Sequence, residues 1–330
     1  MKKVLFVLSM MLMSVCVISC SNKEESVVDT VSYVEEESSE KEAFEVLRQQ
    51  IACLNESYGL YSGISEIGQT RISFFKRFFA TLYADAVGGI VGAGIGGSVA
   101  ALCGTGVSGV IIGSIVGGTI GSVLFSCVVA CAQSIEYAFS GTSTAYMHAK
   151  QQLLSELVFA DPSEAEKIDS IGYYHDSAIL NIFQNSPNLS SYYSASALVD
   201  SIFVHHDDLG ISSGMLSVSS PDSIKNRILS SLYDYFLANE DDETFTTIPS
   251  GKLWNDYSEE LSLAEDYAQD ITSNYITDVH GYTSRYLDLI SGSTLTQQSK
   301  DVLKGSILVG YASYKLWNSS FFSFNNNLLP

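Results

Sequence analysis

One uncharged, glycine-rich stretch limits the possible folds of this chain more than any other feature. Residues 88–121, GGIVGAGIGGSVAALCGTGVSGVIIGSIVGGTIG, contain 13 of the 25 glycines. They lie within a run of 50 residues, between Asp85 and Glu136, that has no charge and no proline. Because a membrane-spanning helix needs only about 20 residues, this run is too long for one span. Cys103-Gly104-Thr105-Gly106 is the obvious turn, so the sequence predicts a helical hairpin over 86–131, with helices at 86–102 and 107–131.

The spacing of the glycines predicts how the two helices pack. Residues four apart lie on one stripe of a helix, and seven glycines have this spacing: Gly88, Gly92, Gly96, Gly109, Gly113, Gly117 and Gly121. Glycine costs about 1 kcal/mol against alanine inside a helix, so close packing or a bilayer must compensate. A stripe without side chains lets a second helix approach closely, and we therefore expect a glycine zipper. The spacing leaves open whether the zipper forms within the hairpin, between copies of the chain, or both.

The N-terminus has the pattern of an export signal. A short basic start precedes an apolar run of 15 residues from Val4 to Ile18, which is short for a membrane span and typical of a signal peptide. Val17-Ile18-Ser19-Cys20 resembles the bacterial lipobox, in which the cysteine is lipidated and becomes the new N-terminus. The resemblance implies a lipoprotein signal peptide over 1–19 and a lipid on Cys20; the alternative is an ordinary secretory signal.

The residues after Cys20 carry a second resemblance. A serine at position 21 resembles an outer-membrane address, and Lys23-Glu24-Glu25 resembles the surface-export tag of Bacteroidetes lipoproteins. These resemblances imply a lipoprotein of the cell envelope, at the outer membrane and on its surface. Residues 21–42 hold eight acids and two lysines, so we expect 20–42 to be an acidic, disordered tether.

The remainder of the chain reads as helical. The pattern predicts N-terminal helices and the hairpin over 43–140, and an all-helical domain over 141–330. The expected C-terminal helices include a run from Lys252 to about Ile290 and a last helix from Thr294 to Trp317, followed by a frayed tail. Helices are also expected over 132–157, after Asp161-Pro162, and after Ser220-Pro221-Asp222. The fold class is therefore all-α, a helical bundle with a glycine-rich apolar hairpin.

A helix with clustered aromatic and basic residues is expected just before the hairpin, over 69–84. Phe74, Phe75, Phe78 and Phe79 nearly encircle it, while Arg71, Lys76 and Arg77 add charge. Basic residues among aromatics suit a membrane interface, and a buried helix with charges at its wet edge explains the pattern equally well.

The lipid-modified N-terminus together with two GxxxG helices joined by a glycine turn resembles a known family segment. It is similar to the glycine-zipper two-helix domain of bacterial outer-membrane lipoproteins of the rickettsial surface-antigen type. The resemblance covers roughly a sixth of the chain and does not extend to the large C-terminal part, so it carries no function for that part.

Candidate chemistry in the sequence is sparse. His205-His206-Asp207-Asp208 offers metal-ligand types, but adjacent residues on a loop point in different directions. His175-Asp176 could orient an imidazole, and Glu240-Asp241-Asp242-Glu243 lacks the spacing of a calcium loop. Cys53, Cys103, Cys127 and Cys131 read as small packing residues, although disulfides remain open. We predict no catalytic residue, no metal site and no cofactor.

The net charge of −20 and pI near 4.4 argue against a nucleic-acid partner, which needs a basic footprint. The sequence therefore favours a non-enzymatic, lipid-anchored envelope protein. The sequence leaves open whether the 86–131 hairpin packs inside the helical bundle or lies at or in the membrane. The expected partners are membrane lipid, through Cys20 and in the second case also through the hairpin, and further copies of the chain. The alternative is an antibacterial or pore-forming effector that shields its hairpin before insertion.

Overall fold

The computed structural model describes residues 30–60, 72–102, 106–132, 135–157, 159, 167–185, 221–239, 245–273 and 275–324. Within these ranges the chain forms ten α-helices, one 3₁₀ turn (Lys167–Ser170) and two short strands. In chain order the elements are α2 (Thr30–Ser57), α3 (Ile72–Leu102), α4 (Gly106–Ala132), β1 (Ile135–Tyr137), α5 (Ser143–Ser155), α6 (Ile171–Asn185), α8 (Pro221–Ala238), α9 (Lys252–Asp256), α10 (Ser258–Thr272), α11 (Val279–Gly292), α12 (Gln297–Trp317) and β2 (Phe322–Phe324). The predicted all-α helical bundle is confirmed.

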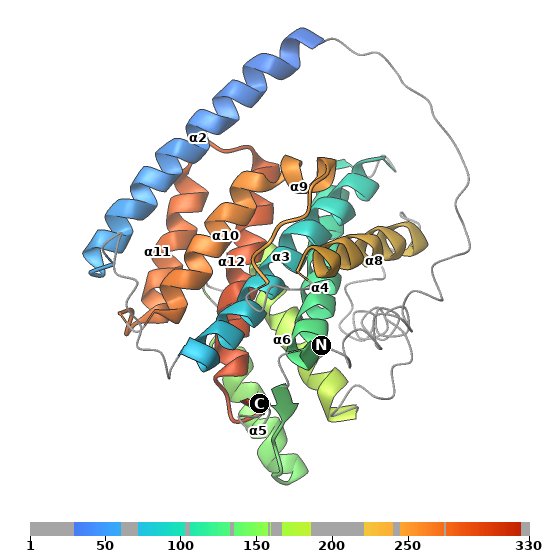
Figure 1. Ribbon diagram of the computed structural model, residues 1–330, viewed down its shortest axis with the longest axis vertical. Helices are drawn as coiled ribbons and strands as arrows, with labels where there is room; N and C mark the ends of the chain where they lie inside the picture. Colours follow the sequence, from blue (N-terminus) through green and yellow to red (C-terminus); the bar gives the residue numbers. More distant parts are fainter. Residues whose placement is uncertain are drawn as a thin grey trace.

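The apolar hairpin forms the centre of the bundle. Helices α3 and α4 make the most extensive contact of any pair, and α12, α10, α6 and α8 pack around them (Figure 1). Among the described residues two segments are long and apolar enough to cross a membrane, Lys76–Ser98 and Gly113–Ala130, and nearly all of their most apolar residues are buried inside the protein. The chain therefore covers its own most apolar helices with other parts of itself.

The surrounding helices are amphipathic, which explains why they settle on the hairpin. Helix α10 buries Leu261, Leu263, Ala264 and Tyr267, while its charged residues other than Glu260 are exposed or partly exposed. Helix α12 is buried along most of its length, with buried residues from Asp301 to Trp317. A side-chain cap begins α12, where the Thr296 hydroxyl oxygen accepts a hydrogen bond from the Ser299 amide at 3.2 Å.

Two predicted helix boundaries need correction. The segment expected as a separate helix over 69–84 is continuous with the first hairpin helix, because nothing in the sequence around Asp85 interrupts α3. Its Phe78 is buried and its Lys76 exposed, which corresponds to the buried helix with charges at its wet edge. The run expected from Lys252 to Ile290 is instead three helices, because the backbone leaves the helical conformation at Tyr257 and again at Ser273, after which Asp278 caps a new helix.

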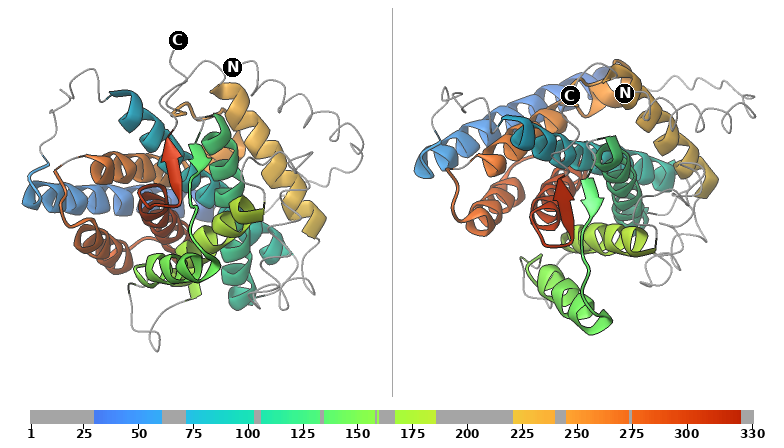
Figure 2. Two further views of the ribbon diagram at one scale, coloured as in Figure 1. Left: turned by 90° about the horizontal axis from the view of Figure 1, so that it is seen from below. Right: turned by 60° about the horizontal axis from the view of Figure 1, so that its bottom comes forward.

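Two further predictions were wrong in part, because one stretch predicted to be helical and the tail predicted to fray each contain a short strand. Residues 135–137 form β1 within the predicted helical stretch 132–157, and the tail expected to fray contributes β2. The two strands pair antiparallel, with Glu136 opposite Ser323 (Figure 2). Aromatic packing explains the order of the tail, since the Phe322 ring lies 4.4 Å from the Trp317 ring between centroids.

The expected tether over 20–42 is shorter than predicted, because α2 begins at Thr30. Residues 20–29 lie outside the described part of the chain. Glutamate and lysine have high helix propensity, so an acidic, serine-containing segment extends a helix whose later turns are docked. That docking is apolar on one side, where Phe44, Leu47 and Ile51 are buried. Helix α2 lies along the outer side of α10 and α11 (Figure 1).

Candidate functional site

Six of the seven glycines in the predicted stripe face one another across the hairpin. The pairs are Gly88 with Gly121, Gly92 with Gly117, and Gly96 with Gly113, an antiparallel register. A Cβ atom added at Gly88 would lie 2.5 Å from the carbonyl oxygen of Gly121, and the other pairs are closer still. The two backbones are thus in direct contact, and the zipper lies within one chain. For Gly109, the seventh glycine, the structure does not describe the surroundings.

A second set of glycines, which the sequence analysis did not single out, faces the surrounding helices. A Cβ at Gly94 would lie 2.5 Å from the ring of Tyr257, and one at Gly118 would lie 2.9 Å from Ile171. Gly89 lies against α12, near Ser306 and Val309. Glycines therefore allow close approach on more than one side of the hairpin. The four-residue spacing in the sequence identifies only the side on which α3 and α4 meet.

A polar cluster is buried beside the zipper. We call it the Asp85 cluster, and it consists of Asp85 of α3, Ser126 of α4, His175 and Asp176 of α6, and Ser313 and Trp317 of α12. Asp85 lies one turn before Gly88 and is fully buried. Its Oδ2 atom accepts hydrogen bonds from the Ser313 hydroxyl and, at 3.2 Å, from Trp317 Nε1. Side chains of α4, α6 and α12 thus lie around this one carboxylate of α3.

The histidine of the cluster lies between two carboxylates. Its Nδ1 atom is 2.9 Å from Asp176 Oδ1, and its Nε2 atom is 3.8 Å from Asp85 Oδ2. The second distance is too long for a hydrogen bond, so within the described residues Nε2 has no hydrogen-bond partner. The sequence analysis noted His175-Asp176 as a pair that orients an imidazole, and the structure places these two residues in contact.

Burial dominates the electrostatics of the Asp85 cluster. Loss of solvent raises the pKa of Asp85 to about 6, although His175 and the Ser313 hydrogen bond pull it down in part. Burial likewise raises the pKa of Asp176, partly offset by His175. Ser313 donates its hydroxyl to Asp85 and not to the imidazole, so this hydroxyl is not paired with the histidine. The arrangement joins helices through buried polar contacts and does not have the geometry of a Ser-His-Asp hydrolase triad.

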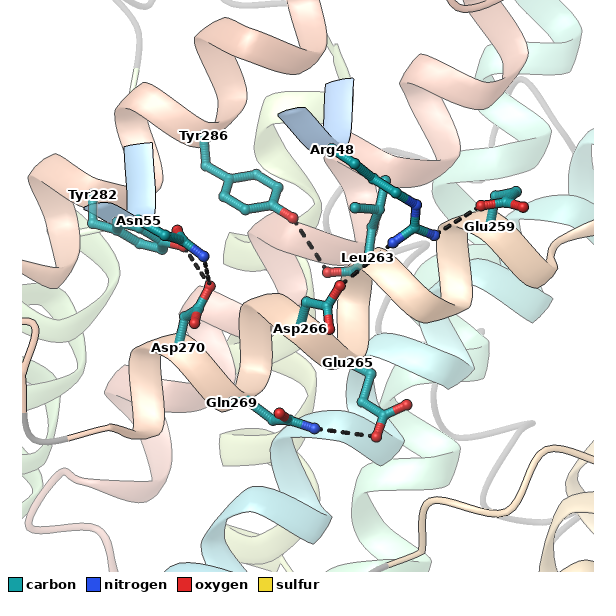
Figure 3. A network of polar contacts seen from close by, with 10 residues as sticks. All are labelled: Arg48, Asn55, Glu259, Leu263, Glu265, Asp266, Gln269, Asp270, Tyr282 and Tyr286. Atoms are coloured by element: carbon teal, nitrogen blue, oxygen red, sulfur yellow. Dashed lines mark hydrogen bonds and ion pairs between the residues drawn. The ribbon is translucent and has the colours of Figure 1, made fainter. Parts of the chain in front are cut away.

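A second polar network joins α2 to the bundle (Figure 3). Arg48 Nη2 lies 2.7 Å from Glu259 Oε2, and its Nη1 lies 3.5 Å from Asp266 Oδ2. Asn55 Nδ2 donates to Asp270 Oδ2 at 2.9 Å. All of the partners on the bundle side belong to α10 or α11. This network connects the N-terminal segment of the chain to the helices that cover the hairpin.

Several predicted site residues lie outside the described part of the chain. These are Cys20, Cys103, the pair His205-His206 with Asp207-Asp208, and the acidic run Glu240–Glu243. Cys53 is exposed on α2 and Cys127 is buried on α4. Across the described residues no three His, Cys, Asp or Glu side chains are grouped closely enough to hold a metal ion.

Comparison of the chain with known protein families, with curated proteins and with solved structures found no match. The zipper, the Asp85 cluster and the network around α2 are therefore the features of the structure that bear on function.

Proposed function

We propose that this chain is a non-enzymatic lipoprotein of the bacterial cell envelope, held at the outer membrane by a lipid on Cys20. In this proposal the glycine-zipper hairpin is the structural core of a helical bundle, and the bundle is the functional body that stands on the lipid anchor. The observation that carries the structural part of the proposal is the closed zipper: Gly92 and Gly117 are in backbone contact within one chain, and both apolar helices are covered by the rest of the bundle. The lipid anchor rests on the resemblance of Val17-Ile18-Ser19-Cys20 to the lipobox.

The covering argues for a role outside the hydrocarbon region. A hairpin that rests in lipid would turn Val, Ile and Leu side chains outward, whereas here Ile90, Val91, Ile120 and Leu124 are buried at 1% exposure or less. The Asp85 carboxylate adds to this argument, since an ionised side chain near the middle of a span is costly in a bilayer. Its hydrogen-bond donors come from α12, which would have to move away before insertion.

The anchor is tested by replacing the cysteine that would carry it. In bacterial cells that express the chain, the Cys20→Ala variant should incorporate no label from an alkyne analogue of palmitate and should leave the membrane fraction. The physical reason is that acylation supplies the apolar surface that holds an acidic protein at a membrane. Cys53→Ala is the matched control and should keep the label. Labelling of Cys20→Ala equal to that of the control would contradict the lipid anchor.

A second candidate function is a membrane-active effector that shields its hairpin until insertion. The observation that favours it is that Lys76–Ser98 and Gly113–Ala130 each have the length and composition of a membrane span. Amphipathic helices cover these two segments, with apolar faces toward the hairpin and polar faces toward water. Such helices could move away from the hairpin and leave it free to insert.

Vesicle leakage separates the two candidates. We expect the purified chain, added to phosphatidylethanolamine–phosphatidylglycerol vesicles loaded with a self-quenched dye, to release no dye above the buffer background at pH 7.4 and at pH 5.5. The reason is that the closed zipper and its covering helices offer the bilayer no continuous apolar surface. Dye release that grows with protein concentration would favour the effector and contradict the structural role.

A further inference from the structure

Three polar contacts along α2 join it to the bundle. At two of them an acid of α10 lies close to other hydrogen-bond acceptors or to another negative charge. Near its middle, Arg48 pairs with Glu259 and Asp266. Near its C-terminal end, Asn55 meets Asp270 and Tyr282 (Figure 3). Toward its N-terminal end, the Glu40 carboxylate accepts hydrogen bonds from Thr296 N at 3.2 Å and Thr296 Oγ1 at 3.0 Å. The first contact is an ion pair, and each of the other two lies close to a buried or partly buried acid of α10, Asp270 or Glu260.

The contact at Asn55 is a closed ring of three hydrogen bonds. Asn55 Nδ2 is 2.9 Å from Asp270 Oδ2, Tyr282 Oη is 2.7 Å from the same oxygen, and Tyr282 Oη is 2.8 Å from Asn55 Oδ1. When Asp270 is ionised, only the amide and the phenol supply protons, so one of the three contacts joins two acceptors. Exchanging the amide oxygen and nitrogen of Asn55 leaves the same deficit.

A proton on Asp270 Oδ2 completes the ring. The carboxyl group then donates to Tyr282 Oη, Tyr282 donates to Asn55 Oδ1, and Asn55 donates to Asp270 Oδ2. Each of the three short contacts gains its own proton. Because Asn55 belongs to α2 while the other two residues belong to α10 and α11, the completed ring binds α2 more tightly to both helices.

The other end of α2 has a related feature. Glu260 of α10 is 3% exposed, and the negative charge of Glu40 on α2 is close enough to disfavour its ionisation. Two like charges in a partly buried contact oppose docking. A proton on Glu260 removes that repulsion and leaves Glu40 free to accept its hydrogen bonds from Thr296.

We propose that α2 is an acid-closed strap: protonation of Asp270 and Glu260 tightens its docking on α10 and α11 and so couples the N-terminal segment of the chain to the bundle. This inference goes beyond the proposed function, and it does not depend on a lipid anchor or on the fate of the hairpin.

The direction of the pH effect follows from the two acids. Burial raises the pKa of Asp270 to about 6 and that of Glu260 to about 7, both above the values of free side chains. The hydrogen bonds from Asn55 and Tyr282 pull the pKa of Asp270 down in part, and the one from Ser299 does the same for Glu260, but burial outweighs them. In this proposal α2 supplies part of that burial, so the docked state binds more protons than the undocked state, and docking strengthens as the pH falls through this range. The gain from Asp270 is complete below about pH 4, its pKa in an unfolded chain.

Other charged groups near the two acids set the limits of the effect. Asp266 faces Asp270 and raises its pKa further, and the phenols of Tyr267, Tyr282 and Tyr286 lie around it. Glu259 stands beside Glu260. Protonation of Asp266 weakens its ion pair with Arg48, but such a partly exposed pair contributes at most about 1 kcal/mol. Docking therefore tightens as the pH falls from about 7.5 to about 4, and the interval from pH 7.5 to 5.5 includes the pKa values of both acids.

Hydrogen exchange of the full chain tests the strap. Protection factors for peptides covering 43–57, corrected for intrinsic exchange and divided by those of α12, should rise by about fourfold or more from pH 7.5 to 5.5. In the Asp270→Asn and Glu260→Gln double variant, α2 should have high protection at pH 7.5 and a flat pH profile. The reason is that the amide at position 270 supplies the missing protons at every pH.

The matched control is Asp288→Asn, which removes an exposed carboxylate of α11 and should keep the wild-type rise. Protection of α2 that is constant or falls in the wild-type chain as the pH drops to 5.5 would overturn the proposal. A double variant that retains the full wild-type rise would overturn it as well, because the rise would then come from other groups.

Discussion

Replacing Gly117 with alanine should destabilise this protein by about 3 kcal/mol, although alanine is the better helix former. The added methyl group would overlap the backbone carbonyl of Gly92, which belongs to the facing helix. A flexible side chain could move aside, but a backbone carbonyl cannot, so the two helices must separate. Separation would weaken every contact along the stripe and also disturb the helices that pack on α3 and α4.

Urea unfolding followed by circular dichroism measures this effect, and the chain contains a matched control. Gly292 ends α11 with no atom within 4 Å of an added Cβ, so Gly292→Ala should change the free energy of unfolding by less than about 1 kcal/mol. Gly117→Ala with the stability of Gly292→Ala would mean that the backbones of α3 and α4 are not in contact.

Removing the carboxylate of the Asp85 cluster should also have a large effect. Asp85→Ala is expected to lower the free energy of unfolding by about 3 kcal/mol, because it leaves buried hydrogen-bond donors of Ser313 and Trp317 without an acceptor. Asp85→Asn keeps an acceptor oxygen at this place and should cost distinctly less. Urea unfolding at pH 7 would contradict the cluster's role if the alanine variant were as stable as the asparagine variant.

A comparison of the wild type with Asp85→Asn also reports the protonation of Asp85. Its pKa of about 6 in the folded protein is above the unfolded value near 4, so the folded state binds the extra proton. The contribution of Asp85 to stability therefore grows as the pH falls through 6, and is complete below about 4. The stability of the wild type relative to Asp85→Asn should rise by up to about 1.4 kcal/mol per pH unit in this window. Parallel pH profiles for the two chains would contradict it.

The hairpin was predictable from the sequence because its signal is local and periodic. Spacing of four identified a stripe on each helix, and the Cys103–Gly106 turn separated the two helices at positions close to the observed ends of α3 and α4. Spacing could not decide what the stripe contacts, since a partner within the chain and a partner in another copy demand the same residues. The structure answers this with the Gly92–Gly117 contact.

The polar sites were not predictable in the same way, because they depend on residues far apart in the chain. Asp85 marked only the start of the uncharged run, and its partner Ser313 is 228 positions away. His175-Asp176 was noted as a pair, yet nothing local shows that α6 carries it to α3. The break between α10 and α11 was missed for a related reason: the apolar periodicity continues through Ser273, and only the cap at Asp278 marks a new helix.

The order of the tail was missed as well. Phe321 and Phe322 precede an asparagine-rich, polar end, which favours fraying when considered by itself. Their rings pack against Phe139, Phe183 and Trp317, and this tertiary packing decides that β2 forms against β1. A short strand of this kind is stable only where the bundle supplies its partners.

The central claim is that this chain shields its apolar hairpin inside its own bundle, and two native thiols test it most directly. Site-resolved alkylation of the purified chain in water, without detergent or lipid, compares Cys127 of α4 with Cys53 of α2. The account predicts that Cys53, which is exposed, reacts rapidly, while Cys127, which is buried, reacts only as fast as the whole protein unfolds. Rapid alkylation of Cys127 in water, with protection only after lipid vesicles are added, would contradict it.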